Sequence, residues 1–412
     1  MLRQPAFGHR LRKLRMAQGL SQTALAGEGM STGYLSRLES GARQPTDRAV
    51  GYLAARLGLE VSDFDEPATG SLAHALTLAA STGSPDAIEA LRRALAAEGH
   101  ESPVLRWQAL WLLAQAARIQ GDLTVERDRL TQLVALGEEA GVSELRVRGL
   151  TRLARCLRSI GEITPALDAA VDAHRIALGE ELGVEDRATA LLALISVQAE
   201  AGRMGEARMH ADELTALVGG RTDALWAEAM WTVAAVRMRQ GDYPGAQACL
   251  DEALDRFSSQ EDLILWIRLR LATARLHLQK LPVDPEQAQL RADEAEAALA
   301  FVGTPTLRQD LTALKADLAF ATGRYDEARA QLGALAADQP RMTHRGRVRL
   351  EMLRYQLLIL GGDPAGMQGL RALAQQAQED ANIDLAAEIW RVLADALTQA
   401  GHQAGQASAV GG

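Results

Sequence analysis

A glycine that follows a Leu- and Ala-rich stretch recurs along most of this 412-residue chain at a nearly constant interval. A polar turn and a second Ala-containing stretch follow it, as in QGDYPGAQACL around Gly241. Glycine supplies the left-handed backbone that ends a helix, so each copy predicts a helix A, a turn and a helix B. Neighbouring copies lie 38 to 41 residues apart, apart from one double step of 82 residues. The glycines are Gly83, Gly121, Gly161, Gly202, Gly241, Gly323, Gly361 and Gly401.

The double step contains LPVDPEQAQL from Leu281, where prolines break the helix in place of glycine. Nine turns at a spacing of about 40 residues indicate a repeat array. Aromatic residues make up only 4% of the chain, so Leu and Ala must fill the core, which favours close-packed helices. We therefore predict an all-α fold in which residues 71–400 form a right-handed α-solenoid of about eight helix pairs with a concave surface. The Gly- and Ala-rich residues 401–412 are expected to form a flexible tail.

Two turns carry a more specific pattern. Gly241, Tyr243, Ala246 and Ala253 match the tetratricopeptide consensus, and GRYDEARAQL at Gly323 matches it again. The array therefore resembles the tetratricopeptide (TPR) family, in which a small residue at the position of Ala246 lets helix B approach helix A. The repeat is longer than the ~34 residues of that family, so HEAT-like pairs of ~40–47 residues are the alternative.

Residues 1–66 do not fit the period and predict a separate small domain, joined through a linker at 67–70. Residues 1–58 carry a net charge of +6 and the remainder −15, so the head is the part that suits a polyanion. Ser21 and Pro45-Thr46-Asp47 are helix-opening signals. The five predicted helices are Phe7–Gln18, Ser21–Ala26, Thr32–Ser40, Asp47–Leu57 and Ser62–Phe64.

This head contains G-L-S-Q at 19–22, L-S-R-L-E-S-G at 35–41 and then Pro45. These motifs resemble the phage-repressor-type (Xre-like) helix-turn-helix (HTH) family, although the segment between Leu25 and Glu39 is one residue shorter than usual. Gly29 falls at the turn before the third helix, where a permissive backbone is expected. Leucines at helical spacing supply a shared core, and the polar side of the third helix suits the major groove.

The resemblance implies that Gln22 binds a phosphate, that Arg37 grips a base and that Arg43 clamps the backbone. Arg15 and Glu39 match an internal salt bridge of the family. Three alternatives stay open: Arg37 as a solvated charge, Tyr34 as a core residue, and a head that binds protein in place of DNA. The full set of candidate DNA-binding residues is Gln22, Ser31, Thr32, Gly33, Tyr34, Ser36, Arg37 and Arg43.

Aligning the repeats by their glycines places arginines and tryptophans on the A helices, which line the concave face in TPR arrays. Such side chains suit an acidic or C-terminal peptide. Alternatively, the tryptophans are core residues and the arginines pair with acidic B helices. The candidate ligand-binding residues are Trp111, Gln115, Arg118, Arg148, Arg155, Arg158, Trp231 and Met238.

A head of this type on such a solenoid resembles the peptide-pheromone-responsive regulators of bacteria. The resemblance implies a DNA-binding transcriptional regulator that dimerises and senses a peptide or protein ligand in its groove. Those regulators clamp the peptide with asparagines, whereas Asn382 is the only asparagine here. The alternative is a protein-interaction scaffold whose head does not bind DNA.

The sequence also excludes several classes of function. It contains no nucleotide-loop, nucleophile-elbow or H-E-x-x-H motif, so we expect no enzymatic activity and no cofactor. The eight histidines are scattered and Cys156 and Cys249 are far apart, so no metal site is expected. Without a secretory signal or an apolar span of ~18 residues, the protein is expected in the cytoplasm. The resemblance to the regulators implies a homodimer on an inverted-repeat operator.

Overall fold

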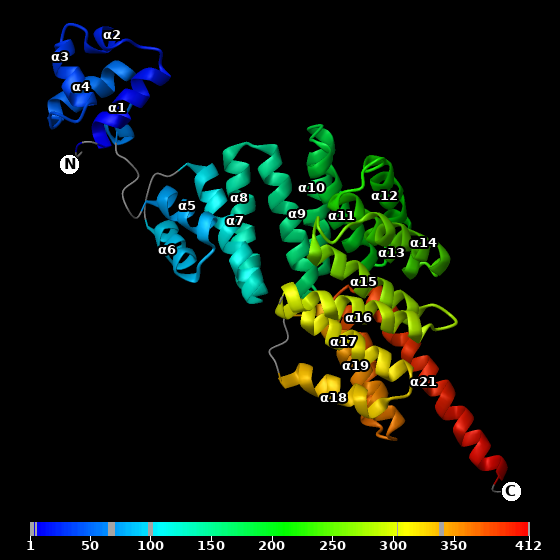
Figure 1. Ribbon diagram of the computed structural model, residues 1–412. Helices are drawn as coiled ribbons and strands as arrows, with labels where there is room; N and C mark the ends of the chain where they lie inside the picture. Colours follow the sequence, from blue (N-terminus) through cyan, green and yellow to red (C-terminus); the bar gives the residue numbers. More distant parts are fainter. Residues whose placement is uncertain are drawn as a thin grey trace. The chain divides into compact units, whose positions relative to one another are not determined.

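The computed structural model describes residues 4, 6–64, 71–97, 102–302, 304–337 and 342–410. Within these residues the chain is all-α, as predicted, with 21 α-helices, one 3-10 helix and no strand (Figure 1). None of the helices in the described ranges is both long and apolar enough to cross a membrane. Residues 1–113 and 114–412 form two compact units, and each is described by itself.

The head domain has the five helices that the sequence predicts, within one residue at each boundary. Its core adds two aromatic rings to the expected leucines, since Phe7 packs against Phe64 with ring centroids 5.5 Å apart. Three polar residues outside helices hold the N-termini: Ser21, Ser31 and Thr46 each accept a hydrogen bond from the backbone N–H three residues later. The helices are α1 (Ala6–Ala17), α2 (Gln22–Ala26), α3 (Thr32–Glu39), α4 (Asp47–Leu57) and the 3-10 helix η1 (Val61–Phe64).

The glycines of the turn before α3 differ from the expectation. Gly27 ends α2 with a φ of 52°, whereas Gly29 has no positive φ. Gly29 is instead covered by Tyr52, whose ring would overlap a Cβ at that position. The Tyr52 hydroxyl accepts from Gly29 N–H and donates to the Ala26 carbonyl, so α4 braces the turn. Close packing, and not a left-handed backbone, therefore accounts for Gly29.

The array consists of eight A–B helix pairs, called repeats 1 to 8 here, followed by α21 (Ile383–Val410). The A helices are α5 (Leu72–Thr82), α7 (Pro103–Gln120), α9 (Ser143–Ile160), α11 (Val184–Glu200), α13 (Ala224–Arg239), α15 (Leu263–Gln279), α17 (Pro305–Ala321) and α19 (His344–Leu360). The B helices are α6 (Pro85–Ala96), α8 (Leu123–Ala140), α10 (Ile163–Gly179), α12 (Met204–Leu217), α14 (Tyr243–Arg256), α16 (Pro285–Val302), α18 (Tyr325–Ala337) and α20 (Ala365–Glu379). Consecutive A helices also pack on one another, α9 on α11 and α11 on α13.

The predicted turns are confirmed in all eight repeats. The prolines at 282 and 285 separate α15 from α16, and a glycine with positive φ separates A from B elsewhere. In repeat 8 that glycine is Gly362, while Gly361 has a φ of −80°. The prediction of a ninth turn at Gly401 is wrong, because α21 continues through this residue to Val410. The seven left-handed glycines are Gly83, Gly121, Gly161, Gly202, Gly241, Gly323 and Gly362.

Small residues near the start of the B helices let the two helices of a repeat approach closely. Ala166, Ala207, Ala246 and Ala328 occupy corresponding positions in four repeats, and each is fully buried. Their side chains contribute little bulk between the helices, as the TPR resemblance implies for Ala246. Leu and Ala dominate the largest core cluster, which joins repeats 4 and 5 to α15.

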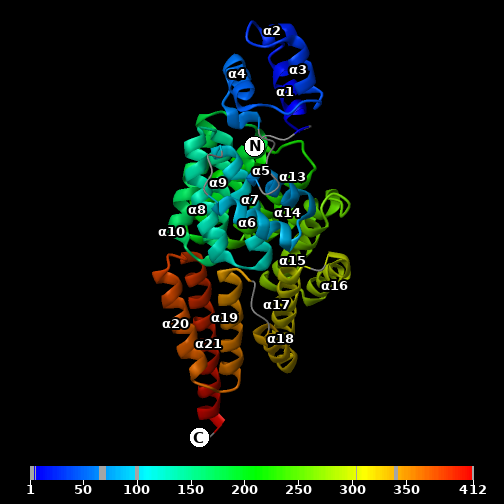
Figure 2. The same ribbon diagram turned by 90° about the vertical axis from the view of Figure 1, so that its left-hand side faces the viewer.

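The last helices of the second unit return to its first repeats. The Asn382 side chain is buried before α21 and donates to the Gly161 carbonyl at 3.3 Å, across 221 residues of sequence. His344 covers Gly161, and Ile383 covers Gly202. Figure 2 shows α19, α20 and α21 below α9 and α10, in agreement with contacts of α19 with α9 and of α21 with α11. The turns of repeats 3 and 4 thus support the far end of the array.

Candidate functional site

Helix α3 of the head presents one polar face to solvent. Leu35, Leu38 and Glu39 are buried, which fixes the rotation of the helix about its axis. The opposite side carries four of the candidate DNA-binding residues, and all four are exposed: Thr32, Gly33, Ser36 and Arg37. A Cβ added to Gly33 would meet no atom within 4 Å, so the surface there is open. Ser31 uses its hydroxyl to cap the helix, accepting from Tyr34 N–H at 3.2 Å.

Arg43 is held beside the C-terminal end of α3. Its backbone N–H donates to the Arg37 carbonyl at 3.1 Å, and its guanidinium lies over the Tyr34 ring, 4.8 Å from the centroid. Tyr34 is half-buried. Its ring packs against the head core and also contacts the guanidinium of Arg43. The stacking orients the exposed Arg43 side chain next to the polar face of α3. We call Thr32, Gly33, Ser36, Arg37 and Arg43 the α3 surface.

Behind this surface, a buried carboxylate ties three helices together. Glu39 accepts from Arg15 Nε at 2.6 Å and Nη2 at 3.0 Å, and from Gln22 Nε2 at 2.8 Å. Burial by itself would raise the pKa of Glu39, but the Arg15 and Gln22 hydrogen bonds outweigh it and lower that pKa. The predicted Arg15–Glu39 salt bridge is present, and it also engages Gln22 at the start of α2.

In the first unit, Trp111 stacks on Trp107 with ring centroids 5.1 Å apart. The two rings line an apolar hollow together with Leu76, Ala80 and Leu112 from α5 and α7. Trp111 therefore contributes to a local aromatic surface on α5 and α7.

In the second unit, the four candidate arginines all form ion pairs. Three of the pairs join A helices of different repeats, and Arg155 of α9 reaches Glu228 of α13, two repeats further on. The tryptophan and methionine candidates, Trp231 and Met238, are half-buried against the core cluster around α13, and Gln115 is exposed. The arginine pairs are Arg118–Glu126 at 3.2 Å, Arg148–Asp186 at 2.7 Å, Arg155–Glu228 at 3.2 Å and Arg158–Glu200 at 2.7 Å.

The last of these pairs belongs to a larger charged cluster that the repeat pattern does not predict. Arg239 of α13 lies 3.8 Å from Glu200 and 3.3 Å from Asp384 of α21. Two arginines of α19 complete the chain of contacts, as Arg345 pairs with Asp384 at 2.6 Å. We call this cluster the interior ion network. Its members are Arg158, Glu200, Arg239, Arg345, Arg349, Asp384 and Glu388.

Burial and charge shift the pKa values in this network strongly. Burial would raise the pKa of Glu388, but the charges of Arg349 and Arg345 outweigh it and hold that pKa at about 2. Burial lowers the pKa of the Arg239 guanidinium to about 10. Nearby, burial raises the pKa of Asp317 to about 6. Charges of both signs are therefore held here at reduced solvation, and their pairing decides the local stability.

The network also leaves hydrogen-bond donors unused. Among the described residues, Arg158 Nε and Arg349 Nε are buried N–H groups without a hydrogen-bond partner. Four arginines pair with three carboxylates in the network, and the nearby carboxylate of Asp317 also acts on Arg349. A hydrogen-bond acceptor placed beside Arg158 Nε and Arg349 Nε would satisfy these two donors.

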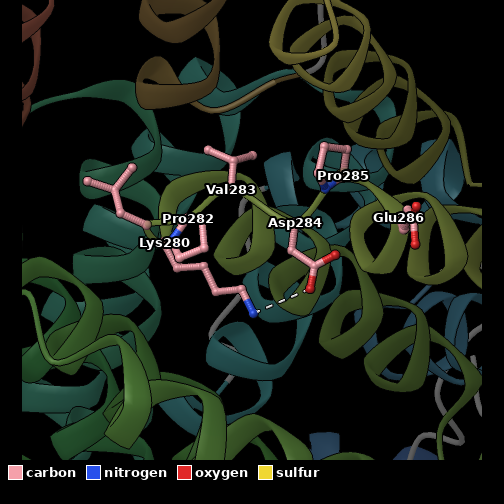
Figure 3. Close-up of a pocket in the computed structure, with 7 residues that line it drawn as sticks. Lys280, Pro282, Val283, Asp284, Pro285 and Glu286 are labelled. Atoms are coloured by element: carbon pink, nitrogen blue, oxygen red, sulfur yellow. Dashed lines mark ion pairs between the residues drawn. The ribbon is translucent and has the colours of Figure 1, made fainter.

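A hollow at the turn of repeat 6 does not bring together polar groups from several helices, as the interior ion network does. Its lining comes from the single segment 280–286, in which Lys280 Nζ lies 3.5 Å from Asp284 Oδ2 (Figure 3). The figure shows Val283 and Pro285 pointing away from this ion pair. Side chains from different elements must converge to form a ligand site, and this turn supplies only its own.

Two family matches agree with this geometry. Residues 6–66 match the family described as Helix-turn-helix domain, and residues 72–140 match that described as Tetratricopeptide repeat. The second match favours the TPR assignment over the HEAT-like alternative for its segment. None of the curated proteins matches the chain.

Solved structures extend the similarity over the whole chain. A Rap protein complexed with Competence and Sporulation Factor is 12% identical, with a TM-score of 0.54 over 97% of this chain and 100% of that one. The Rap conjugation gene regulator of plasmid pLS20, in complex with the Phr* peptide, is 11% identical, with a TM-score of 0.55 over 93% and 98%. PlcR of Bacillus thuringiensis, in complex with the peptide PapR7 and DNA, is 14% identical, with a TM-score of 0.43 over 74% and 98%. The first two share the helical-repeat fold, and the lower score of the third establishes no shared fold.

Proposed function

We propose that this chain, in which a helix-turn-helix domain is followed by tetratricopeptide repeats, is a sequence-specific DNA-binding transcriptional regulator of the Xre type. The α3 surface carries the proposal: α3 is oriented by its buried leucines so that Arg37 and three small or polar residues face outward. A guanidinium can bind guanine through two hydrogen bonds, which makes Arg37 the main base-reading candidate. Arg43 and Gln22 would hold the phosphate backbone.

In this proposal two copies of the protein bind one inverted-repeat operator. The third helix of an HTH domain enters the major groove, and a dimer places two such helices about 34 Å apart. The net charge of +6 on residues 1–58 favours association with DNA, while the acidic remainder does not. The protein would act in the cytoplasm and would have no enzymatic activity.

Removal of both arginines of the α3 surface tests the DNA-binding function. The operator is first selected from a random duplex pool with the full-length protein at about physiological salt, where non-specific binding is weak. We expect the Arg37→Ala, Arg43→Ala double variant to bind it at least ~100-fold more weakly, because a good base contact contributes about 1–3 kcal/mol and a phosphate contact adds to it. Fluorescence anisotropy titrations at several salt concentrations measure the loss of affinity and the smaller salt dependence that the missing phosphate contact causes.

The matched control is Arg48→Ala, which removes an exposed head arginine that lies on α4. We expect its DNA affinity to stay close to that of the parent, and the thermal stability of both variants to be unchanged. Absence of any enriched duplex with the folded parent protein would instead support the scaffold alternative, in which the head binds a protein.

We further propose that the interior of the second unit binds a peptide or protein ligand with a carboxylate. The unused Arg158 Nε and Arg349 Nε donors support this choice, because a carboxylate accepts hydrogen bonds from guanidinium groups. The two Rap structures, which share the fold, were each solved with a bound partner, and one of these is named as a peptide. Such a ligand would touch α9 and α19 together and so couple the two ends of the unit.

Thermal melting with a library of short peptides tests the ligand proposal. A peptide that binds the native state raises the melting temperature. We expect amidation of its carboxyl end, or Arg158→Met in the protein, to weaken binding about 10- to 100-fold through the loss of a charge-assisted hydrogen bond. Arg175→Ala, an exposed arginine on α10, is the control and should bind normally. A peptide that binds equally well after Arg158→Met would contradict this site.

A further inference from the structure

Two histidines and a glutamate come together between the B helices of repeats 3 and 4. His174 lies on α10, and His210 and Glu213 lie on α12. One ligand atom from each of the three lies within 4.8 Å of the other two, and all three side chains are half-buried. We propose that these residues bind a divalent transition metal ion, with zinc as the best fit. This site is independent of the DNA and peptide proposals.

The three side chains come from two helices that both pack against α11 and meet through their side chains. His210 and Glu213 are three residues apart on α12 and therefore lie on the same face of that helix. The His174 ring meets the His210 ring edge to face, with centroids 5.3 Å apart. The ligands thus come from two elements that are 36 residues apart in the sequence, which explains why a search for closely spaced histidines does not find them.

A hydrogen bond behind His210 prepares its ring for a metal. His210 Nδ1 lies 2.8 Å from Oε1 of Gln198, a residue of α11 that is 1% exposed. The Gln198 amide nitrogen is occupied separately, because it donates to Glu206 at 3.1 Å. Gln198 therefore offers only its carbonyl oxygen to His210, and Nδ1 must carry the hydrogen. The lone pair of Nε2 is then available, the arrangement that orients metal-binding histidines in general.

The ligand set favours zinc among the common ions. Imidazole nitrogen suits zinc, copper, iron and nickel, while calcium and magnesium prefer oxygen. Two histidines and one glutamate give zinc three protein ligands, and water completes a tetrahedron. At metal–ligand bonds of about 2.0–2.1 Å the three atoms must move closer together than 4.8 Å, by side-chain rotation. Arg187 of α11 places a positive charge near His174 that opposes binding of the ion, while the Glu213 carboxylate favours it.

The experiment titrates zinc and cobalt into full-length protein that has been freed of metal with a chelator. We expect one ion per chain, a visible cobalt absorption of the low-coordinate type, and a higher melting temperature with zinc. His174→Ala and His210→Ala should each abolish the cobalt absorption, and Glu213→Gln should weaken binding. Gln198→Leu should reduce affinity roughly 10- to 100-fold, as loss of a metal ligand's hydrogen-bond partner typically does.

His74→Ala, which removes a half-buried histidine of α5, is the control and should bind like the parent. Circular dichroism of each variant without metal shows whether the helices are intact. The proposal is overturned if the parent binds no zinc, or if folded His174→Ala and Glu213→Gln proteins bind zinc and cobalt as the parent does.

Discussion

Replacement of Arg15 by alanine is expected to unfold the helix-turn-helix domain while the repeats stay folded. Glu39 is 5% exposed, and Arg15 supplies two of its three hydrogen bonds, at 2.6 and 3.0 Å. Without Arg15 the carboxylate is buried with only Gln22 as a donor. Removal of one partner from a buried ion pair costs about 3–5 kcal/mol. A domain of about 60 residues has a free energy of unfolding of only about 3–9 kcal/mol, so this loss approaches the total stability of the domain.

Hydrogen exchange of the full-length protein measures this effect helix by helix. In the Arg15→Ala variant, amides of α1 to α4 should exchange much faster than in the parent, and those of α13 should not change. Lys13→Ala removes an exposed charge from the same helix and should shift stability by less than about 0.5 kcal/mol. The double variant Arg15→Met, Glu39→Met should recover much of the protection, because apolar residues can replace a buried pair. Parent-like protection of the head in Arg15→Ala would contradict this account.

The second large effect is expected at Glu388. Its side chain is 17% exposed and lies 2.9 Å from Arg345 and 3.0 Å from Arg349. Glu388→Gln keeps the shape and removes the charge, so Arg349 loses its ion-pair partner and Arg345 keeps only Asp384. The pKa of Glu388 is about 2 against an ordinary 4.5, and that difference corresponds to about 3 kcal/mol. We expect the free energy of unfolding at neutral pH to fall by about that amount.

The sign of the pH dependence gives a sharper test of the same variant. Because folding lowers the pKa of Glu388, its contribution is complete above pH 4.5 and is lost as the pH falls toward 2. Denaturant unfolding of parent and Glu388→Gln proteins should therefore converge over that interval. Asp317 acts in the opposite direction, since its pKa is raised to about 6, but it is present in both proteins.

Glu379→Gln, at an exposed position on α20, is the matched control for Glu388→Gln and should follow the parent at every pH. If the difference between parent and Glu388→Gln stays constant as the pH falls, the ion pairs of Glu388 do not stabilise the unit.

The parts of the fold that local chemistry determines could be predicted from the sequence. Ser21 and Thr46 cap the helices they precede, so the head boundaries follow from hydrogen bonds made within three residues. The repeat turns follow from glycines that need a left-handed backbone. Gly401 shows the limit of that signal, because glycine inside a helix costs only about 1 kcal/mol relative to alanine and a helix can continue through it.

The interior of the second unit could not be predicted, because its contacts join residues far apart in the chain. The repeat pattern places Arg158 on the inner face but does not show that Glu200 and α19 meet it there. Asn382 is noticed in the sequence only for being the single asparagine, whereas its role is to bond the Gly161 carbonyl. Long-range closure depends on the curvature summed over several repeats, and no single repeat carries that information.

The contact of α19 and α21 with the turns at Gly161 and Gly202 fixes the number of repeats. An open array can gain or lose a repeat at modest expense, since each repeat touches only its neighbours and their stabilities add. Here one extra repeat between α11 and α19 would displace Asn382 from Gly161 and separate Asp384 from Arg239. We therefore expect the second unit to unfold as one closed domain of fixed size, and not repeat by repeat.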